Sequence, residues 1–269
     1  MAVKFKICCS QNVKIAIMEN QKTAQELYQM SQDFYHTGWF ETALDWIEKA
    51  IVAQSHDLSF FQLRGMILSK LHLYDQALQD FDRIIQHFTS TKNSLDIDQE
   101  LRVAAILNRI QVYFQQKNYD ELIQDGNAIL QVQRNHWQAF FYRGIGYYFG
   151  KSDQQALEDL DMAFYLSNQK DKVRPFRALA YFKQGKYALA EIDFEIAVKN
   201  KPQDGVLWYN YGLNAYRLQQ FESALERFNQ ALQAGLVNKQ VYIYKGKVLQ
   251  ALDRCQEAEA CNLKATTMK

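Results

Sequence analysis

The sequence has few of the residues that interrupt helices. It contains two prolines and eleven glycines among 269 residues. Proline breaks the interior of a helix and glycine weakens it, so their scarcity favours long helices. No apolar run approaches the roughly 20 residues that a membrane-spanning helix requires. We therefore expect no insertion into a membrane.

An excess of charge of either sign is also lacking. Lys and Arg together number 31, against 30 for Asp and Glu, which gives a formal net charge of +1 at pH 7. Nucleic-acid-binding domains and proteins that bind anionic membranes carry a basic surplus, so neither partner is expected.

Cysteine is scarce, and its spacing does not suggest a metal site. The four cysteines are Cys8, Cys9, Cys255 and Cys261, and they form neither a CxxC pair nor a zinc-ligand pattern. We interpret them as inert or structural thiols and expect no bound metal. No secretory apolar segment precedes Cys8, so we expect a cytoplasmic protein.

Signatures of catalysis are missing as well. The chain has no glycine-rich phosphate loop, no HExxH motif and no nucleophile elbow. Its histidines are scattered, and acidic runs such as Glu158, Asp159 and Asp161 are typical of a solvated helix face. We therefore expect neither enzymatic activity nor a cofactor.

What the sequence does contain is a repeated pair of helices. In residues 137–170 apolar residues recur every three to four positions, which indicates one helix face before Gly150 and another after it. The first face holds Phe140, Gly144, Tyr147 and Tyr148, and the second holds Ala156, Leu160 and Ala163. Neither helix can bury its apolar face alone, so antiparallel hairpins that stack on their neighbours are expected.

The unit recurs in steps of about 34 residues, a length typical of helix-hairpin repeats. At this spacing small or apolar residues reappear as Ala43, Ala77, Leu122, Ala156, Ala190, Ala224 and Ala258. The step from Ala77 to Leu122 is longer than the others, which predicts an insertion near residues 92–102. The predicted repeats are residues 24–57, 58–91, 103–136, 137–170, 171–204, 205–238 and 239–269.

Each repeat places a large residue, a glycine and a second large residue on its first helix, and a small residue, an aromatic residue and another small residue on its second. Examples are Phe61, Gly65, Leu68, Ala77 and Phe81, and Trp208, Gly212, Ala224, Phe228 and Ala231. In these residues the chain resembles the tetratricopeptide repeat (TPR) family over nearly its whole length. The resemblance implies an all-α fold, a right-handed superhelical solenoid of about seven antiparallel helix hairpins covering residues 24–269. The family's proline after the second helix survives only as Pro202.

Residues 1–23 form an extension with a different pattern. Residues 1–17 alternate apolar and polar positions, which is the period of a strand. Three interpretations stay open: a hairpin packed on the first repeat, a disordered segment, and a stretch upstream of a true start at Met18.

Four local signals refine the prediction. Pro175 fits the first turn of a helix, so the fifth repeat should begin late. Gly235 should follow the end of a helix. In the third repeat Leu122 and Gly126 replace the usual small and aromatic residues in a compensating way. The polar residues 84–100 either lengthen the flanking helices or form a loop.

A charged pattern accompanies repeats two to five. An arginine before the glycine position is followed sixteen residues later by an aspartate, as in Arg64 with Asp80, Arg109 with Asp125, Arg143 with Asp159 and Arg177 with Asp193. Repeats one, six and seven lack both residues. We expect structural ion pairs within each repeat or to the adjoining one, because a buried guanidinium needs a partner. The alternative is a track that binds anions.

The TPR resemblance implies that a partner binds the concave face, which the first helices line. Apolar side chains exposed there favour interaction, and aromatic residues in particular often dominate binding energy. The earlier repeats are more polar on this face, with Gln25, Gln29, Gln32, Gln62, Asn108 and Gln111. In repeats four to six it is expected to expose Phe141, Tyr142, Ile145, Tyr148, Phe149, Phe176, Leu179, Phe182, Lys183, Tyr209, Asn210, Leu213, Tyr216 and Arg217.

We therefore predict a scaffold or adaptor that binds a peptide or helix of a partner protein in an aromatic groove. Two alternatives stay open: a structural subunit that uses this surface for permanent assembly, including self-association, and a regulator that tightens around a signal peptide.

Overall fold

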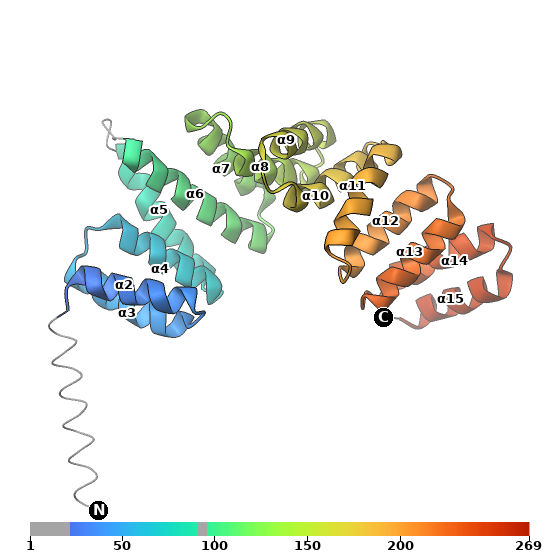
Figure 1. Cartoon of the computed structure of the whole chain (residues 1–269), viewed down its shortest axis with the longest axis horizontal. Helices are drawn as coiled ribbons and strands as arrows, with labels where there is room; N and C mark the ends of the chain where they lie inside the picture. The colour runs from blue at the N-terminus through green and yellow to red at the C-terminus, as the bar shows by residue number, and fades with distance from the viewer. Residues whose placement is uncertain (1–21, 91–95, 269) are drawn as a thin grey trace, which may run out of the picture. The chain divides into compact units, whose positions relative to one another are not determined.

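The computed structural model describes residues 22–90 and 96–268, and within these ranges every regular element is an α-helix (Figure 1). Most of the predicted extension, residues 1–21, lies outside the described residues. The prediction of an all-helical chain is confirmed for the rest.

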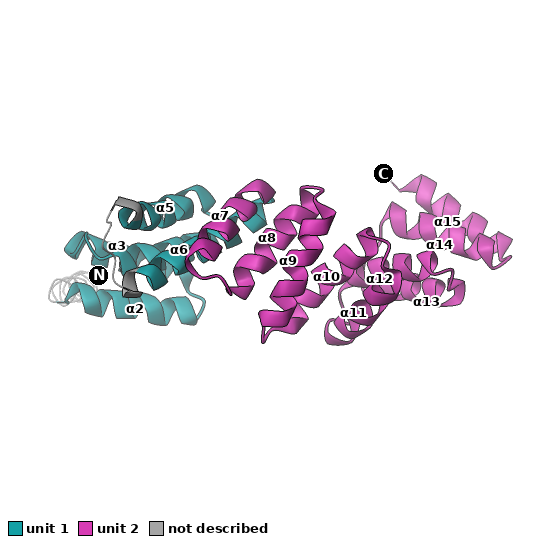
Figure 2. Ribbon diagram, turned by 90° about the horizontal axis from the view of Figure 1, so that it is seen from above, with its two compact units in different colours: residues 1–117 teal, residues 118–269 magenta. Residues whose placement is uncertain are grey.

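The chain divides into two compact units, residues 1–117 and residues 118–269 (Figure 2), and we describe each by itself. Unit 1 contains α2 (Ala24–His36), α3 (Phe40–Ala53), α4 (Leu58–Lys70), α5 (Tyr74–Ser90) and α6 (Asp96–Gln116). Unit 2 contains α7 (Tyr119–Val132), α8 (Trp137–Phe149), α9 (Asp153–Leu166), α10 (Lys170–Lys183), α11 (Tyr187–Asn200), α12 (Gly205–Arg217), α13 (Phe221–Gln233), α14 (Lys239–Ala251) and α15 (Cys255–Thr267).

Within each unit, every helix contacts the next one along the chain, as the stacked hairpins of a TPR solenoid do. The first helices also contact one another: α2 with α4 and α4 with α6 in unit 1, and α8, α10, α12 and α14 in succession in unit 2. The predicted repeat 103–136 crosses the division between the units and stays a prediction.

Polar caps explain where several helices begin. Thr23 and Glu26 form a reciprocal capping box at α2, and the carboxylates of Asp57 and Asp204 accept backbone N–H bonds at the starts of α4 and α12. Asn238 caps α14 in the same way. Each side chain supplies an acceptor to a backbone N–H that has no partner within its helix.

The residues that define the 34-residue spacing lie in the core. Ala43, Ala77, Leu122, Ala156, Ala190 and Ala224 are completely buried, and Ala258 is 1% exposed.

Aromatic residues fill the space beside the glycines. A Cβ atom added to Gly65 would lie 2.6 Å from Phe81 Cε1, and one added to Gly212 would lie 2.7 Å from Phe228 Cε1. The glycines therefore let the two helices of a pair approach each other closely.

The prediction for Pro175 is wrong. Helix α10 begins at Lys170, so Pro175 lies inside the helix and not in its first turn. Proline has no N–H, so the carbonyl one turn earlier, that of Asp171, loses its intrahelical donor. The residues between Lys170 and Pro175 remain helical despite that loss.

Of the other local signals, the polar stretch was left open between two outcomes, and the structure favours one of them; the prediction for Gly235 is confirmed. The polar stretch lengthens the flanking helices, since α5 continues to Ser90 and α6 already begins at Asp96, while residues 91–95 lie outside the described residues. Gly235 follows the end of α13 with a φ of +87°, in the left-handed region that ends many helices.

Candidate functional site

Three arginines hold the aspartates that the sequence pattern assigned to them. Arg64 Nε lies 2.8 Å from Asp80 Oδ2, Arg143 Nε lies 2.7 Å from Asp159 Oδ2, and Arg177 Nε lies 2.6 Å from Asp193 Oδ2. In each pair a second guanidinium nitrogen donates to the other carboxylate oxygen, and each aspartate is buried. Arg109 and Asp125 belong to different units, so their pairing stays a prediction.

The arginines also reach the preceding helix pair. Arg143 Nη1 donates to Asn127 Oδ1 at 2.6 Å, and Arg177 Nη1 lies 3.5 Å from Asp161 Oδ1. In unit 1 Arg109 forms an ion pair with Asp82. The guanidinium groups of Arg143 and Arg177 therefore have protein partners on both sides, which favours the structural interpretation of these pairs over an anion-binding track.

The sequence analysis missed a related cluster on α11, α12 and α13. Arg227 stacks over the ring of Tyr211, with 3.5 Å from its guanidinium carbon to the ring centroid, and binds Glu191 Oε1 at 2.6 Å. Asn214, which is fully buried, donates to Glu191 Oε2 at 2.8 Å. Tyr211 and Arg227 occupy the positions that hold Arg and Asp in repeats two to five, and that exchange was the available signal.

The predicted aromatic groove is only partly exposed. Phe141 is 8% exposed and Ile145 is completely buried, so the expectation that they face solvent is wrong. Phe141 packs edge-on against Phe176 of α10, with 5.4 Å between the ring centroids. These two side chains of α8 therefore contribute to the packing between neighbouring helix pairs.

The remaining predicted residues lie at or near the surface of α8, α10 and α12, and we call them the aromatic surface. Phe149, Lys183 and Arg217 are exposed. The half-buried members are Tyr142, Tyr148, Phe176, Leu179, Phe182, Tyr209, Asn210, Leu213 and Tyr216.

Contacts within the aromatic surface fix several of its members. Lys183 Nζ lies 2.6 Å from Asp153 Oδ1, donates to the carbonyl oxygen of Tyr148 at 2.8 Å and sits 4.7 Å from the Tyr148 ring centroid. Tyr209 lies 5.9 Å from Phe228 and 6.2 Å from Tyr244 between ring centroids. These side chains are held in place before any partner arrives.

Burial also raises the pKa of tyrosine hydroxyls on this surface. Desolvation raises the pKa of Tyr142 and of Tyr148, and it raises the pKa of Tyr209 to about 12. At neutral pH each hydroxyl is thus a hydrogen-bond donor beside an apolar ring.

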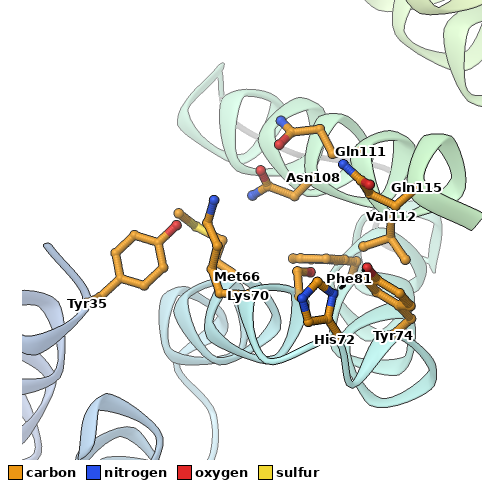
Figure 3. A pocket seen from close by; sticks show the side chains of 11 residues that line it. Tyr35, Met66, Lys70, His72, Tyr74, Phe81, Asn108, Gln111, Val112 and Gln115 are labelled. Atoms are coloured by element: carbon orange, nitrogen blue, oxygen red, sulfur yellow. Dashed lines mark hydrogen bonds between the residues drawn. The ribbon is translucent and has the colours of Figure 1, made fainter. Parts of the chain in front are cut away.

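A hollow of about 530 Å³ lies in unit 1, and we call it the amide hollow (Figure 3). Helices α2, α4, α5 and α6 and the turn between α4 and α5 supply its walls. Its lining is Tyr35, Met66, Ser69, Lys70, His72, Tyr74, Phe81, Asn108, Gln111, Val112 and Gln115.

The sequence analysis identified only part of this lining. It placed Asn108 and Gln111 on the polar part of the concave face, but it did not single out Lys70, Met66 or Tyr35. Helical spacing offered a signal, because residues 108, 111 and 115 share one face of α6. The depth of the hollow depends on side chains from four helices and could not be inferred from one segment.

Metal and membrane sites are not found in the described part of the chain. No group of three or more His, Cys, Asp or Glu residues is placed there to hold a metal ion. Cys255 is exposed and Cys261 is buried, both as free thiols. No described helix has the length and apolarity that crossing a bilayer would require.

Comparisons with known proteins point to one family. The profile described as tetratricopeptide repeat matches residues 177–235. Human tetratricopeptide repeat protein 16 is 25% identical over 242 residues, which cover 86% of this chain and 24% of the human protein. The mouse protein of that name is 24% identical over 223 residues. The chain thus spans about a quarter of the length of these curated relatives.

Solved structures agree on the fold. A tetratricopeptide repeat protein from Parabacteroides merdae is 19% identical, with a TM-score of 0.64 over 91% of this chain and 93% of that one. MamA from Desulfovibrio magneticus RS-1 is 18% identical, with a TM-score of 0.55 over 61% of this chain and 93% of the MamA chain.

The stacked helix hairpins, their 34-residue spacing and these similarities agree with one another: the chain has the fold of tetratricopeptide repeat proteins, and its residues 177–235 match the profile of that family.

Proposed function

We propose that the chain is a protein-interaction scaffold that holds a peptide segment or helix of a partner protein on the aromatic surface of unit 2. One observation carries the proposal: half-exposed aromatic side chains occur on the first helices of three successive pairs, α8, α10 and α12. These helices contact one another in turn, so their side chains can form a continuous surface.

The chemistry of this surface suits a segment with apolar anchors. Aromatic rings contribute large contact areas, and rings that are already packed lose little freedom when a partner binds. Tyrosine hydroxyls at the surface can donate to backbone carbonyls of the bound segment. The exposed guanidinium of Arg217 adds a cationic group at the end of α12.

The test compares partner capture by the wild-type chain and by the double variant Phe149→Ser, Arg217→Glu. Both residues are exposed, so the variant should fold. The matched control is Tyr165→Ser, because Tyr165 on α9 is 79% exposed and lies outside the aromatic surface. Proteins that are captured by the wild type and the control, and lost with the double variant, would support the proposal. Equal capture by all three would contradict it.

Sedimentation and small-angle scattering of the purified chain separate this proposal from the permanent-subunit alternative. A folded monomer is expected of an adaptor with a free binding surface. Self-association that the double variant abolishes would assign the same surface to assembly. A regulator would become more compact when its peptide binds.

A further inference from the structure

We infer that one edge of unit 2, made by the connections between successive hairpins, binds the surface of a membrane that contains anionic lipids. The inference goes beyond the proposed function, because this edge shares no residue with the aromatic surface and takes a different kind of partner. The contact is peripheral: it uses charges and a few protruding side chains, and no helix enters the bilayer.

The direction of the helices defines this edge. In unit 2 each helix contacts the next one after a short connection, so consecutive helices run in opposite directions (Figure 2). The connections between hairpins therefore lie at one edge of the unit, and the turns within hairpins lie at the other. We call the first the basic edge: it comprises residues 133–136, 167–169, 201–204 and 234–238, the helical turns that adjoin them, and the last turn of α15.

Charge is distributed unequally between the two edges. The basic edge carries two acids, Asp171 and Asp204, and seven exposed cations: Arg134, Lys170, Lys172, Lys199, Lys201, Lys239 and Lys264. The opposite edge consists of residues 150–152, 184–186, 218–220 and 252–254, their adjoining turns and the first turn of α7. It carries five cations and six acids. The net charge of +1 for the whole chain therefore conceals a local positive excess.

Most of these cations are available to an external anion. Among the described residues only Lys199 has an ion-pair partner, with its Nζ 2.7 Å from Glu195 Oε1. The two acids of the edge are already engaged. Asp204 accepts a hydrogen bond from the backbone N–H of Leu207 at the start of α12, and Asp171 Oδ1 lies 3.6 Å from Arg174 Nε. The positive excess is thus left without neutralisation by the described part of the chain.

Apolar side chains protrude from the same edge. Val132 at the end of α7 is 37% exposed, and Tyr165 in the last turn of α9 is 79% exposed. Val206 in the first turn of α12 is 55% exposed, and Val237 in the connection before α14 is 59% exposed. Single exposed apolar residues are common. Lysines attract anionic headgroups, and apolar side chains beside them can enter the interface, where tyrosine is enriched.

The composition of the basic edge favours lipid headgroups over nucleic acid or an acidic protein segment. Six of the seven cations are lysines, which act as hydrated point charges. Recognition of a base or of a single carboxylate favours the planar guanidinium group of arginine. The valines offer neither a hydrogen bond nor an aromatic ring to a nucleic acid. A bilayer accommodates both kinds of side chain, because its headgroups lie directly above its acyl chains.

Co-sedimentation of the full chain with lipid vesicles tests the inference. One set of vesicles is phosphatidylcholine alone, and the other contains about 30% phosphatidylserine, which supplies an anionic surface. We expect binding to the anionic vesicles to be about tenfold or more tighter than binding to the neutral ones. Binding should weaken as salt rises from about 0.1 M to 1 M, because the Debye length falls from about 10 Å to 3 Å.

Charge variants locate the binding edge. The double variant Lys172→Glu, Lys201→Glu should weaken binding to anionic vesicles about tenfold or more. The matched control Lys151→Glu, Lys186→Glu makes the same change in net charge at the opposite edge and should bind like wild type. All four lysines are exposed, so the variants should fold, and circular dichroism melts check this.

A second variant tests the apolar part of the contact. Val206→Ser, Val237→Ser leaves the charge unchanged and should weaken vesicle binding about threefold or more, because binding strength grows with the apolar area that enters the interface. Both valines are exposed, so their replacement should not disturb the core.

Three results would overturn the inference. The first is equal binding to neutral and anionic vesicles. The second is an equal loss of binding by Lys172→Glu, Lys201→Glu and by its control, which would indicate a general charge effect. The third comes from fluorescence anisotropy with labelled duplex DNA or polyglutamate at the same salt. If either binds as tightly as the anionic vesicles, and the valine variant binds the vesicles like wild type, the edge belongs to nucleic acid or to an acidic protein.

Discussion

At the scale of single residues, the pair of Arg143 and Asp159 shows how hydrogen bonds compensate a buried charge in this protein. The carboxylate is buried, and two guanidinium nitrogens donate to it at 2.7 Å. Removing one member would leave the other charge buried without compensation. The rest of the guanidinium is occupied by Asn127 on the preceding helix, so the pair also joins two hairpins.

We predict that Asp159→Asn lowers the free energy of unfolding by about 3 kcal/mol, because the charge of Arg143 would lose its counter-ion in a largely buried site. Urea denaturation measures the change. The control is Glu195→Gln, which breaks the exposed pair with Lys199 and should cost less than about 1 kcal/mol. Equal, small losses for both variants would mean that the Asp159 pair behaves like a surface pair.

Because of Tyr209, the free energy of unfolding should change with pH in the alkaline range. Burial raises its pKa to about 12, against about 10 in an unfolded chain. Between these values the unfolded state loses the proton first, so this contribution to stability is complete below pH 10 and declines as pH rises towards 12. Urea denaturation between pH 9 and 12 should show a shallower decline for Tyr209→Phe than for wild type. Tyr165→Phe, at a mostly exposed position, should follow wild type.

At the scale of elements, the turns share a backbone feature that the sequence obscures. In each turn between the two helices of a hairpin one residue has a positive φ: Gly38, His72, Lys117, Lys151, Gly185, Gln219 and Asp253. Only two of them are glycines. The turn geometry is therefore imposed by the packed helices even where the residue itself disfavours it.

We predict that Lys151→Gly raises the free energy of unfolding by roughly 1 kcal/mol, because Lys151 has a φ of +64° and glycine removes the steric cost of that conformation. Thermal and urea denaturation measure the effect. Glu226→Gly, at an exposed position in the interior of α13, is the contrasting control and should lower stability by about 1 kcal/mol. Destabilisation by both changes would show that the turn has little strain to relieve.

Gly126 marks a close contact between α7 and α8. A Cβ atom there would lie 2.8 Å from Arg143 Cβ and 3.1 Å from the carbonyl oxygen of Ala139. The stem of Arg143 therefore lies directly against the backbone of α7 at Gly126.

We therefore predict that Gly126→Ala costs about 1 to 3 kcal/mol and that Gly126→Phe costs at least as much, because both overfill this contact. Alanine normally stabilises a helix relative to glycine, so the sign of the change is diagnostic. Thermal denaturation by circular dichroism tests it. An unchanged or higher melting temperature for Gly126→Ala would show that α7 moves away at little cost.

At the scale of the whole molecule, the contacts within each unit run mainly between consecutive hairpins. In such repeat proteins stability is approximately a sum over repeats and their interfaces. Unit 2 has its own buried clusters, one around Phe194 and another around Phe228. Its first helix begins at Tyr119, directly after the division between the units.

We predict that the fragment 118–269 folds without residues 1–117. It should show helical circular dichroism and a cooperative urea transition, because its hairpins bury their apolar faces against one another. Limited proteolysis provides a second readout. A fragment that is unfolded, or that lacks a cooperative transition, would show that unit 2 depends on unit 1.

Sequence periodicity predicted the helices well and the surfaces poorly. The spacing of Ala43, Ala77 and Ala156 located helix pairs because a close contact between helices favours small residues. The burial of Phe141 and Ile145 was missed, because a position beside the expected groove can instead pack on the next hairpin. Pro175 was misplaced because packing kept the residues before it helical.

The sequence by itself determined the helical class, the length of the repeat and the Arg–Asp pattern, since each depends on residues at fixed intervals along one chain. Only the tertiary structure decided which aromatic side chains stay exposed, where each arginine finds its second partner and that a hollow forms in unit 1. Those features depend on side chains from several helices meeting in space. Burial and cavity shape are set by that three-dimensional packing and leave no periodic signal in the sequence.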